Sequence, residues 1–406
     1  MDSSRAGSWS RRRFVAAAAA ALPLTACGTG SPPAGAPSAS PPPAGSQRGR
    51  TPSPRPSPRA SGASGPRPLY LGTYTSGEGG GRGVGLASYD PETGRVGPVG
   101  LLAEVADPSY LAVHPDGRTL YAVSEREDGA LTAVRLADRK VLGSRGTGGA
   151  GPCQVSVHPD GRWLLSANYA SGSVAVHPIE ASGAIGERTD VVTHSRPAPG
   201  PGQRGPHAHQ FVTGPDPSTV LAVDLGTDTV YSYRLDPRMG TLEETGRART
   251  RAGAGPRHLT FHPGGAYAYL ANEADNTVAV CAWDGANGRL TVGDPQPTGT
   301  GAGTNYPAQF AVTADGAFAY LANRGHNSVT RYAVEEAGAR LRLLDTVPVG
   351  GDFPRHLALS PDGRLLFTAN QRSSTVSVFR VDAASGGLRL AGRPFASPVA
   401  VCALPL

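Results

Sequence analysis

The feature that most constrains the fold is a unit that recurs six times between residues 108 and 382. Each copy has a short apolar strand, a tight turn and two further apolar strands. The pattern is clearest in Pro152-Cys-Gln-Val-Ser-Val-His-Pro-Asp-Gly and Pro354-Arg-His-Leu-Ala-Leu-Ser-Pro-Asp-Gly. Counting between the turn positions 115, 159, 215, 263, 314 and 361 gives steps of 44, 56, 48, 51 and 47 residues. Units of this length, built from four short strands, are typical of β-propeller blades. The repeat therefore predicts an all-β propeller.

The two ends of the repeat region predict a seventh blade. Residues 68–75 resemble the second strand of a copy and residues 83–90 the third, but no first strand precedes them. Residues 397–404 resemble a first strand with nothing after it. We therefore expect a seven-bladed ring over residues 68–406, in which the N- and C-terminal strands share one blade. Closure of this kind leaves no exposed sheet edge, so we expect a monomer.

The first 67 residues carry export signals. Arg11, Arg12 and Arg13 precede an apolar run at 15–24, a pattern typical of a Tat-type signal peptide. The run is too short to span a membrane in the mature protein. It ends in Leu24-Thr-Ala-Cys27, which resembles a bacterial lipobox. We predict a lipoprotein signal at 1–27 with Cys27 as the lipidated residue, the alternative being an ordinary signal with a chance cysteine.

Residues 28–67 consist mainly of Gly, Ser, Pro, Ala and Arg, which predicts a disordered tether. Together with the signal, this predicts an extracytoplasmic protein that contacts the membrane only through its N-terminal lipid.

The net charge of +6 comes from the N-terminal segment. Nine Arg and one Asp in residues 1–67 contribute +8, which leaves −2 (6 − 8) for residues 68–406. Basic patches with interleaved aromatic residues are absent from the repeats, so we expect no nucleic-acid partner. Cys153, Cys281 and Cys402 lie in apolar strand patterns and are predicted to be buried free thiols. No metal-ligand spacing appears, so we expect neither a metal nor another cofactor.

Polar residues gather at the start of the first strand of each copy, which is the innermost strand of a propeller blade. We call the residue six positions before each turn the first position and the next residue the second position. The first positions are Ser109, Cys153, His209, Arg257, Ala308 and Arg355, and the second positions are Tyr110, Gln154, Gln210, His258, Gln309 and His356. The end of the second strand reaches the same face and holds Glu125, Tyr169, Leu225, Glu273, Arg324 and Gln371. The repeat therefore predicts a funnel of polar groups at one mouth of the central channel.

Departures from the repeat predict which of these residues act chemically, because a structural role should recur in every blade. On this ground His209, Arg257, Glu273 and Arg355 are the predicted catalytic residues. The predicted substrate-binding residues are His207, His258, His356, Gln154, Gln309, Glu125 and Arg324. His114, His158 and His262 precede turns on the opposite face and are predicted to be structural.

Several of these segments together resemble the lactonase family of seven-bladed propellers, which includes propeller-type 6-phosphogluconolactonase and carboxy-cis,cis-muconate cyclase. The segments are Gly205-Pro-His-Ala-His-Gln, Gly255-Pro-Arg-His, Ala271-Asn-Glu and Pro354-Arg-His, on blades of this length. The resemblance covers residues 68–406. It implies a histidine, two arginines and a glutamate around the channel mouth, at His209 or His207, Arg257, Arg355 and Glu273.

The chemistry of these groups suits that resemblance. Opening a lactone requires a base that activates water and donors that stabilise the oxyanion formed on the carbonyl oxygen. His209 or Glu273 could be the base, and Arg257 and Arg355 could bind the oxyanion or another anionic group.

Export argues against an intracellular phosphosugar, so we expect a sugar lactone or another small lactone as substrate. Two alternatives remain: a non-catalytic propeller that binds a cell-wall or extracellular ligand, and a cycloisomerase that runs lactone chemistry in the opposite direction.

Overall fold

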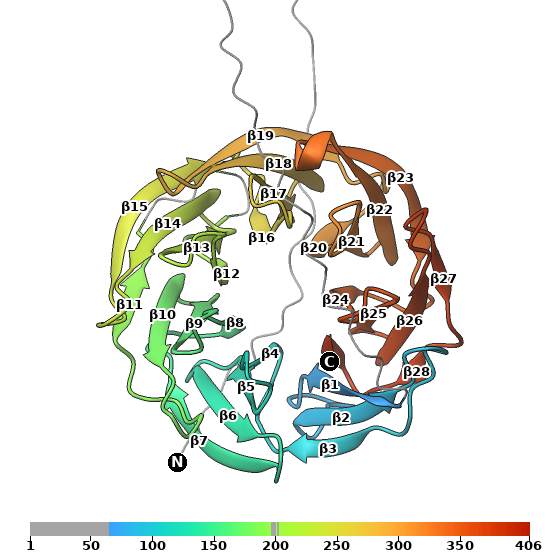
Figure 1. Ribbon diagram of the computed structural model, residues 1–406, viewed down its shortest axis with the longest axis horizontal. Helices are drawn as coiled ribbons and strands as arrows, with labels where there is room; N and C mark the ends of the chain where they lie inside the picture. The colour runs from blue at the N-terminus through green and yellow to red at the C-terminus, as the bar shows by residue number, and fades with distance from the viewer. Residues whose placement is uncertain (1–64, 196–199, 201–202) are drawn as a thin grey trace, which may run out of the picture. The chain divides into compact units, whose positions relative to one another are not determined.

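The computed structural model describes residues 65–195, 200 and 203–406. These residues form one folded unit, Gly65–Leu406, in which seven antiparallel sheets are arranged around a central axis (Figure 1). The predicted signal and Cys27 lie outside the described residues, as does the predicted tether up to residue 64. Within the described ranges the one helical element is a 3-10 turn, η1 (Glu336–Gly338), and no helix is long and apolar enough to cross a membrane.

We number the blades from 1 to 7 in chain order. Blade 1 consists of β29 (Ala400–Pro405), β1 (Arg67–Thr73), β2 (Val84–Tyr89) and β3 (Gly100–Ala103). Blade 2 consists of β4 (Leu111–Val113), β5 (Thr119–Ser124), β6 (Ala130–Arg135) and β7 (Lys140–Gly146). Blade 3 consists of β8 (Pro152–Val157), β9 (Trp163–Asn168), β10 (Ser173–Pro178) and β11 (Asp190–Thr193). Blade 4 consists of β12 (Ala208–Thr213), β13 (Thr219–Asp224), β14 (Thr229–Leu235) and β15 (Leu242–Arg249).

The remaining three blades follow the same order. Blade 5 consists of β16 (Pro256–Phe261), β17 (Tyr267–Asn272), β18 (Thr277–Asp284) and β19 (Arg289–Pro297). Blade 6 consists of β20 (Tyr306–Val312), β21 (Phe318–Arg324), β22 (Ser328–Glu335) and β23 (Arg340–Pro348). Blade 7 consists of β24 (Pro354–Leu359), β25 (Leu365–Asn370), β26 (Thr375–Val381), β27 (Leu388–Leu390) and the short β28 (Phe395–Ala396), which pairs with β26.

Blade 1 closes the ring. The C-terminal strand β29 pairs antiparallel with β1, with Leu71 opposite Ala403 and Gly72 opposite Cys402. The predicted seven-bladed architecture and its closure by the two terminal strands are confirmed. In each other blade the strand that comes first along the chain is the innermost one, as Figure 1 shows for β4, β8, β12, β16, β20 and β24.

The core lies between neighbouring blades, because each sheet is apolar on both faces. Seven hydrophobic clusters fill the seven interfaces. The cluster between blades 3 and 4, for example, joins Leu165 and Val176 to Phe211 and Tyr233. Cys281 and Cys402 belong to such clusters, and all three described cysteines are buried free thiols, as predicted.

Polar ties also join neighbouring blades on both faces of the ring. On one face, His114 and His158 bind the backbone carbonyl oxygens of Gly161 and Pro217 in the following blade, at 2.9 and 2.7 Å. These contacts agree with the structural role predicted for the turn histidines. On the other face, Asp228 adopts a left-handed φ of 50° in the turn between β13 and β14. Its Oδ1 accepts the N–H of Gly255 at 2.8 Å, in the segment that leads into blade 5.

Candidate active site

The first position of the innermost strand is the extra residue of a β-bulge in most blades. In blade 4, Ala208 lies opposite Asp224 and Gln210 opposite Val223, so His209 has no partner of its own. The same shift in register occurs at Cys153, Arg257 and Arg355. A bulge redirects the side chain that it carries. The repeat thus places a redirected side chain at the channel in blades 3, 4, 5 and 7.

These side chains converge on a central cavity. Its free volume is about 10 Å³, which is the space that a single water molecule needs. The cavity is lined by both positions of the inner strands: Ser109, Tyr110, Cys153, Gln154, His209, Arg257, His258, Gln309, Arg355, His356 and Val401. Residues more than 200 positions apart in the sequence therefore share one wall. A lactone ring is too large for this volume, so in a lactone-binding site this cavity would form only the floor.

Tyr110 is one of the residues that line the cavity. Its hydroxyl accepts a hydrogen bond from Gln309 Nε2 at 3.2 Å, a contact between blades 2 and 6. Its ring packs edge-on against His356 of blade 7, with 5.4 Å between the ring centroids. Burial raises the pKa of Tyr110 to about 12, so the hydroxyl keeps its proton. Because Gln309 Nε2 can only donate, the hydroxyl proton of Tyr110 points elsewhere.

Two arginine–glutamate groups flank the cavity. In the first, Glu273 Oε2 lies 3.0 Å from Arg257 Nε and 2.5 Å from an Nη of Arg324. In the second, Glu125 Oε2 lies 3.5 Å from an Nη of Arg355 and accepts the hydroxyl of Tyr74 at 2.7 Å. Three guanidinium groups thus face two carboxylates, which leaves one net positive charge and suits an anion or a developing oxyanion.

The environment of Glu273 makes it a weak base. Burial raises its pKa, but Arg324 and Arg257 outweigh that effect and hold the pKa below its usual range. Burial, together with Arg324, lowers the pKa of Arg257. The Nε of Arg257 has no hydrogen-bond partner within the described residues, since its contact with Glu273 is an ion pair only. Glu273 thus holds the guanidinium of Arg257 at the cavity through an ion pair.

His209 has the properties expected of a base that accepts a proton from water. Burial, followed by the charges of Arg257 and Arg355, lowers its pKa well below 6.5, so the ring is neutral at neutral pH. It is 7% exposed, and its Nδ1 has no hydrogen-bond partner in the part of the chain that the structure describes. A buried polar nitrogen of this kind costs free energy unless something binds it.

The second positions differ, because they bind the next blade. The Oε1 of Gln154 accepts the N–H of Phe211, and the Oε1 of Gln210 accepts the N–H of Leu259, at 2.9 and 2.7 Å. The amide of Gln210 also donates to His258 Nε2 at 3.0 Å. His356 Nδ1 accepts the N–H of Ala403 at 3.4 Å. Gln154, His258 and His356 line the cavity, but part of their hydrogen-bonding capacity is already used; substrate binding by them stays a prediction.

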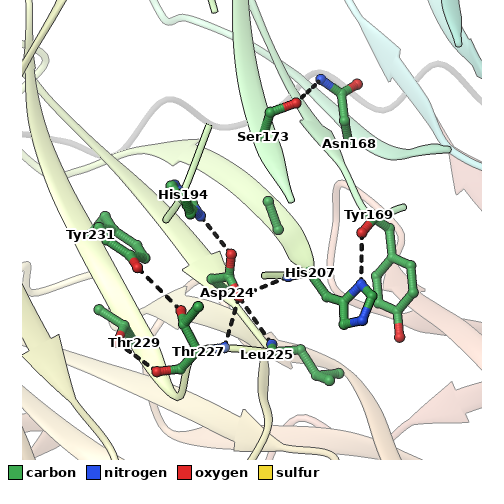
Figure 2. Close-up of polar contacts among 12 residues, drawn as sticks. Asn168, Tyr169, Ser173, His194, His207, Asp224, Leu225, Thr227, Thr229 and Tyr231 are labelled. Carbon is green, nitrogen blue, oxygen red and sulfur yellow. Dashed lines mark hydrogen bonds and ion pairs between the residues drawn. The ribbon is translucent and has the colours of Figure 1, made fainter. Parts of the chain in front are cut away.

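His207, Glu125, Arg324 and Glu273 are near the cavity without lining it. The last three act through the arginine–glutamate groups described above. His207 Nδ1 donates to the carbonyl oxygen of Tyr169 at 2.9 Å, and its ring stacks on the Tyr169 ring at a centroid distance of 4.5 Å (Figure 2). The edge of Tyr169 in turn contacts His209, with 5.7 Å between the ring centroids.

Sequence reasoning missed three contributors: Tyr74, Tyr110 and Phe353. Tyr110 is one of the six second positions. The other five are Gln or His, so the aromatic side chain was the signal that could have singled it out. Phe353 adopts a left-handed φ of 64° and packs beneath the guanidinium of Arg372, 3.8 Å from the ring centroid. Arg324 lies 5.4 Å from the same ring. A bulky residue in this conformation is strained, which is common near functional sites.

Comparisons with known proteins point to one family. Residues 68–405 match the family described as Lactonase, 7-bladed beta-propeller. The chain is 31% identical over 290 residues to the 6-phosphogluconolactonase of Bacillus subtilis, an alignment that covers 70% of this chain and 82% of that protein. It is 30% identical over 267 residues to the 6-phosphogluconolactonase of Pectobacterium atrosepticum, covering 63% and 76% of the two chains. Among solved structures, the periplasmic gluconolactonase of Pseudomonas aeruginosa has a TM-score of 0.78 at 31% identity, covering 84% of this chain and 99% of that one.

Proposed function

Because the chain belongs to the lactonase family of seven-bladed propellers, we propose that it hydrolyses a sugar lactone or another small lactone at the channel mouth. The observation that carries the proposal is the convergence of His209, Arg257 and Arg355 from three separate bulges on one cavity. A neutral imidazole beside two guanidinium groups supplies both requirements of the reaction, a proton acceptor and oxyanion donors.

The proposed reaction begins with a water molecule held by His209. The water oxygen attacks the lactone carbonyl carbon while His209 takes one of the water protons. Arg257 and Arg355 stabilise the negative charge that forms on the carbonyl oxygen. The tetrahedral intermediate then collapses, the ring C–O bond breaks, and His209 returns the proton to the departing alkoxide. The product is the open hydroxy acid, which ionises to its carboxylate.

Between the two bases that the sequence allowed, the geometry favours His209. Glu273 is paired with Arg257 and Arg324, whereas His209 lines the cavity and its Nδ1 has no hydrogen-bond partner among the described residues. We therefore assign Glu273 the role of holding Arg257, and Glu125 the same role for Arg355. The prediction that no metal takes part stays a prediction, and dialysis against a chelator followed by an assay tests it.

The proposed substrate is an unphosphorylated lactone outside the cytoplasm. Two observations support this choice: the Tat-type and lipobox pattern that ends at Cys27, and the likeness to a gluconolactonase whose name places it in the periplasm. Replacing Cys27 by Ala should release the protein from the membrane fraction. If the Cys27→Ala variant sediments with the membranes as the wild type does, the lipid anchor is wrong.

A panel of lactones assayed on the full chain tests the activity. It should include glucono-1,5-lactone, its 6-phosphate and a simple γ-lactone, each corrected for spontaneous hydrolysis. We expect turnover of glucono-1,5-lactone or another unphosphorylated member. A rate at the spontaneous level for every lactone would leave a non-catalytic binding protein as the better account. Turnover of the 6-phosphate alone would contradict the proposed substrate but not the chemistry.

A further inference from the structure

A buried histidine–aspartate pair between blades 3 and 4 binds the segment leading to His209. Asp224, the last residue of β13, is fully buried, and its Oδ2 lies 2.5 Å from Nδ1 of His194 (Figure 2). His194 follows β11 and therefore belongs to blade 3. The pair thus joins two neighbouring blades at the end from which the inner strands start.

Asp224 is the hub of a dense set of hydrogen bonds. Its Oδ1 accepts the backbone N–H groups of His207, Gly226 and Thr227 at 2.9, 3.0 and 2.9 Å. The carbonyl oxygen of His207 accepts the N–H of Leu225 at 3.0 Å. The backbone of His207 is therefore fixed on both sides, two residues before the bulge residue His209.

Both ring nitrogens of His194 have a hydrogen-bond partner. Its Nε2 lies 3.0 Å from the hydroxyl of Tyr233, and its ring stacks on Tyr231 with 3.9 Å between the centroids. Burial raises the pKa of Tyr233, so this hydroxyl keeps its proton, and the carboxylate of Asp224 can only accept a hydrogen bond. The proton on Nδ1 then donates to Asp224. Both nitrogens of His194 are thus occupied.

The other blades do without this pair. At the position of Asp224 they have Asn168, Asn272, Asn323 and Asn370, and Ser124 in blade 2. All four of these amides donate to a hydroxyl at the start of the next strand of the same blade, as Asn272 does to Thr277 at 3.0 Å. In those blades a proline precedes the bulge, whereas blade 4 has Ala208 there, preceded by His207. The histidine–aspartate pair accompanies the one blade whose bulge carries a histidine.

We propose that Asp224 and His194 are positioning residues for His209: they fix the backbone at His207, and through it the direction of the bulge side chain. A second path reinforces the first, because the fixed His207 stacks on Tyr169, whose edge packs against His209. Neither Asp224 nor His194 touches the cavity. The inference rests on the proposed role of His209 as base.

Asp224→Asn is the informative variant, because it restores the residue type that four other blades use. The amide oxygen keeps an acceptor for the backbone N–H groups, but its NH₂ group then faces the Nδ1–H of His194. We expect kcat on glucono-1,5-lactone to fall about 100-fold, the effect of displacing a reacting group by roughly 1 Å, with KM changed less than about threefold. The matched control is Asp160→Asn, the same change in the His158–Asp160 pair on the opposite face, which should leave both constants unaltered.

Two variants of His194 separate positioning from folding. His194→Gln keeps a side-chain N–H for Asp224 and should retain kcat within about threefold. His194→Leu removes the donor and should lower kcat as Asp224→Asn does. The proposal is overturned if both variants lose activity equally. It is also overturned if cooling to a temperature at which Asp224→Asn is fully folded restores the wild-type kcat.

A readout without substrate keeps this test distinct from the test of lactone hydrolysis. In the full chain labelled with ¹⁵N-histidine, the ring resonances of His209 are assigned by their loss in His209→Gln. We expect them to shift in Asp224→Asn and not in Asp160→Asn. Unshifted resonances would refute the positioning role. A shift in a protein that hydrolyses no lactone would refute only the proposed function.

Discussion

The first and second positions at the start of each inner strand differ in what they contact. The first position is a bulge residue in most blades, varies from blade to blade, and holds His209, Arg257 and Arg355 at the cavity. The second position is Gln or His in five of the six copies and mostly binds the following blade. In the proposed function, the residue that acts on the substrate and the residue that binds the next blade are therefore neighbours in the sequence. The difference predicts that variants at the two positions damage different properties.

The largest effect is expected at a first position. Arg257→Gln removes a cavity-lining guanidinium that the proposed reaction uses to stabilise the substrate oxyanion. Loss of one such donor typically lowers kcat by about 10²–10³. Steady-state kinetics and thermal unfolding, measured together, should show the loss of kcat with a small change in Tm. As a control, Arg342→Gln removes an exposed arginine paired with Glu335 and should change neither.

A second position should show the reverse pattern. Gln154→Ala leaves the N–H of Phe211 without its acceptor at the interface of blades 3 and 4. An unsatisfied buried N–H costs about 1–3 kcal/mol of stability. Denaturant unfolding should show this loss, with kcat on the same lactone within about threefold of wild type. A variant that is as stable as wild type but inactive would remove the distinction between the two positions.

A further effect is expected at acid pH, at another second position. Burial, with the charges of Arg257 and Arg355, lowers the pKa of His356 from 6.5 to about 3. Over this pH range the unfolded chain therefore binds a proton that the folded chain does not bind. The free energy of unfolding falls as the pH drops from about 6.5 toward 3. One such group contributes about 1.4 kcal/mol per pH unit. The free energy of unfolding of His356→Gln should fall that much less steeply between pH 6 and pH 4. Parallel curves for the two proteins would contradict this burial effect.

Most of the fold was predictable because the repeat is long and regular. Strand order, the closing strand at Ala400–Pro405 and the buried thiols all follow from aligned apolar alternation. The bulges were not predictable from the sequence, since one extra residue in a six-residue strand leaves the apolar pattern almost unchanged. The bulges occur at Arg257 and Arg355, whereas His258 and His356 beside them have strand partners. We therefore assign different roles to the two kinds of residue.

The candidate site was predictable only where the alignment supplied the comparison. His209, Arg257, Glu273 and Arg355 stand out as departures from the repeat. Tyr110 could not be paired with Gln309 from the sequence, because 199 residues separate them and nothing local indicates a contact across the ring. His194 follows a short outer strand with no aligned equivalent, so its contact with Asp224 required the structure.

The most direct test of the account is the kcat of His209→Gln on the lactone that the wild type turns over fastest. A positioned general base contributes about 10²–10⁴ to the rate. The account predicts a fall of at least about 100-fold at pH 7, in a protein whose Tm stays near that of wild type. A folded His209→Gln variant that hydrolyses the lactone at the wild-type rate would contradict it.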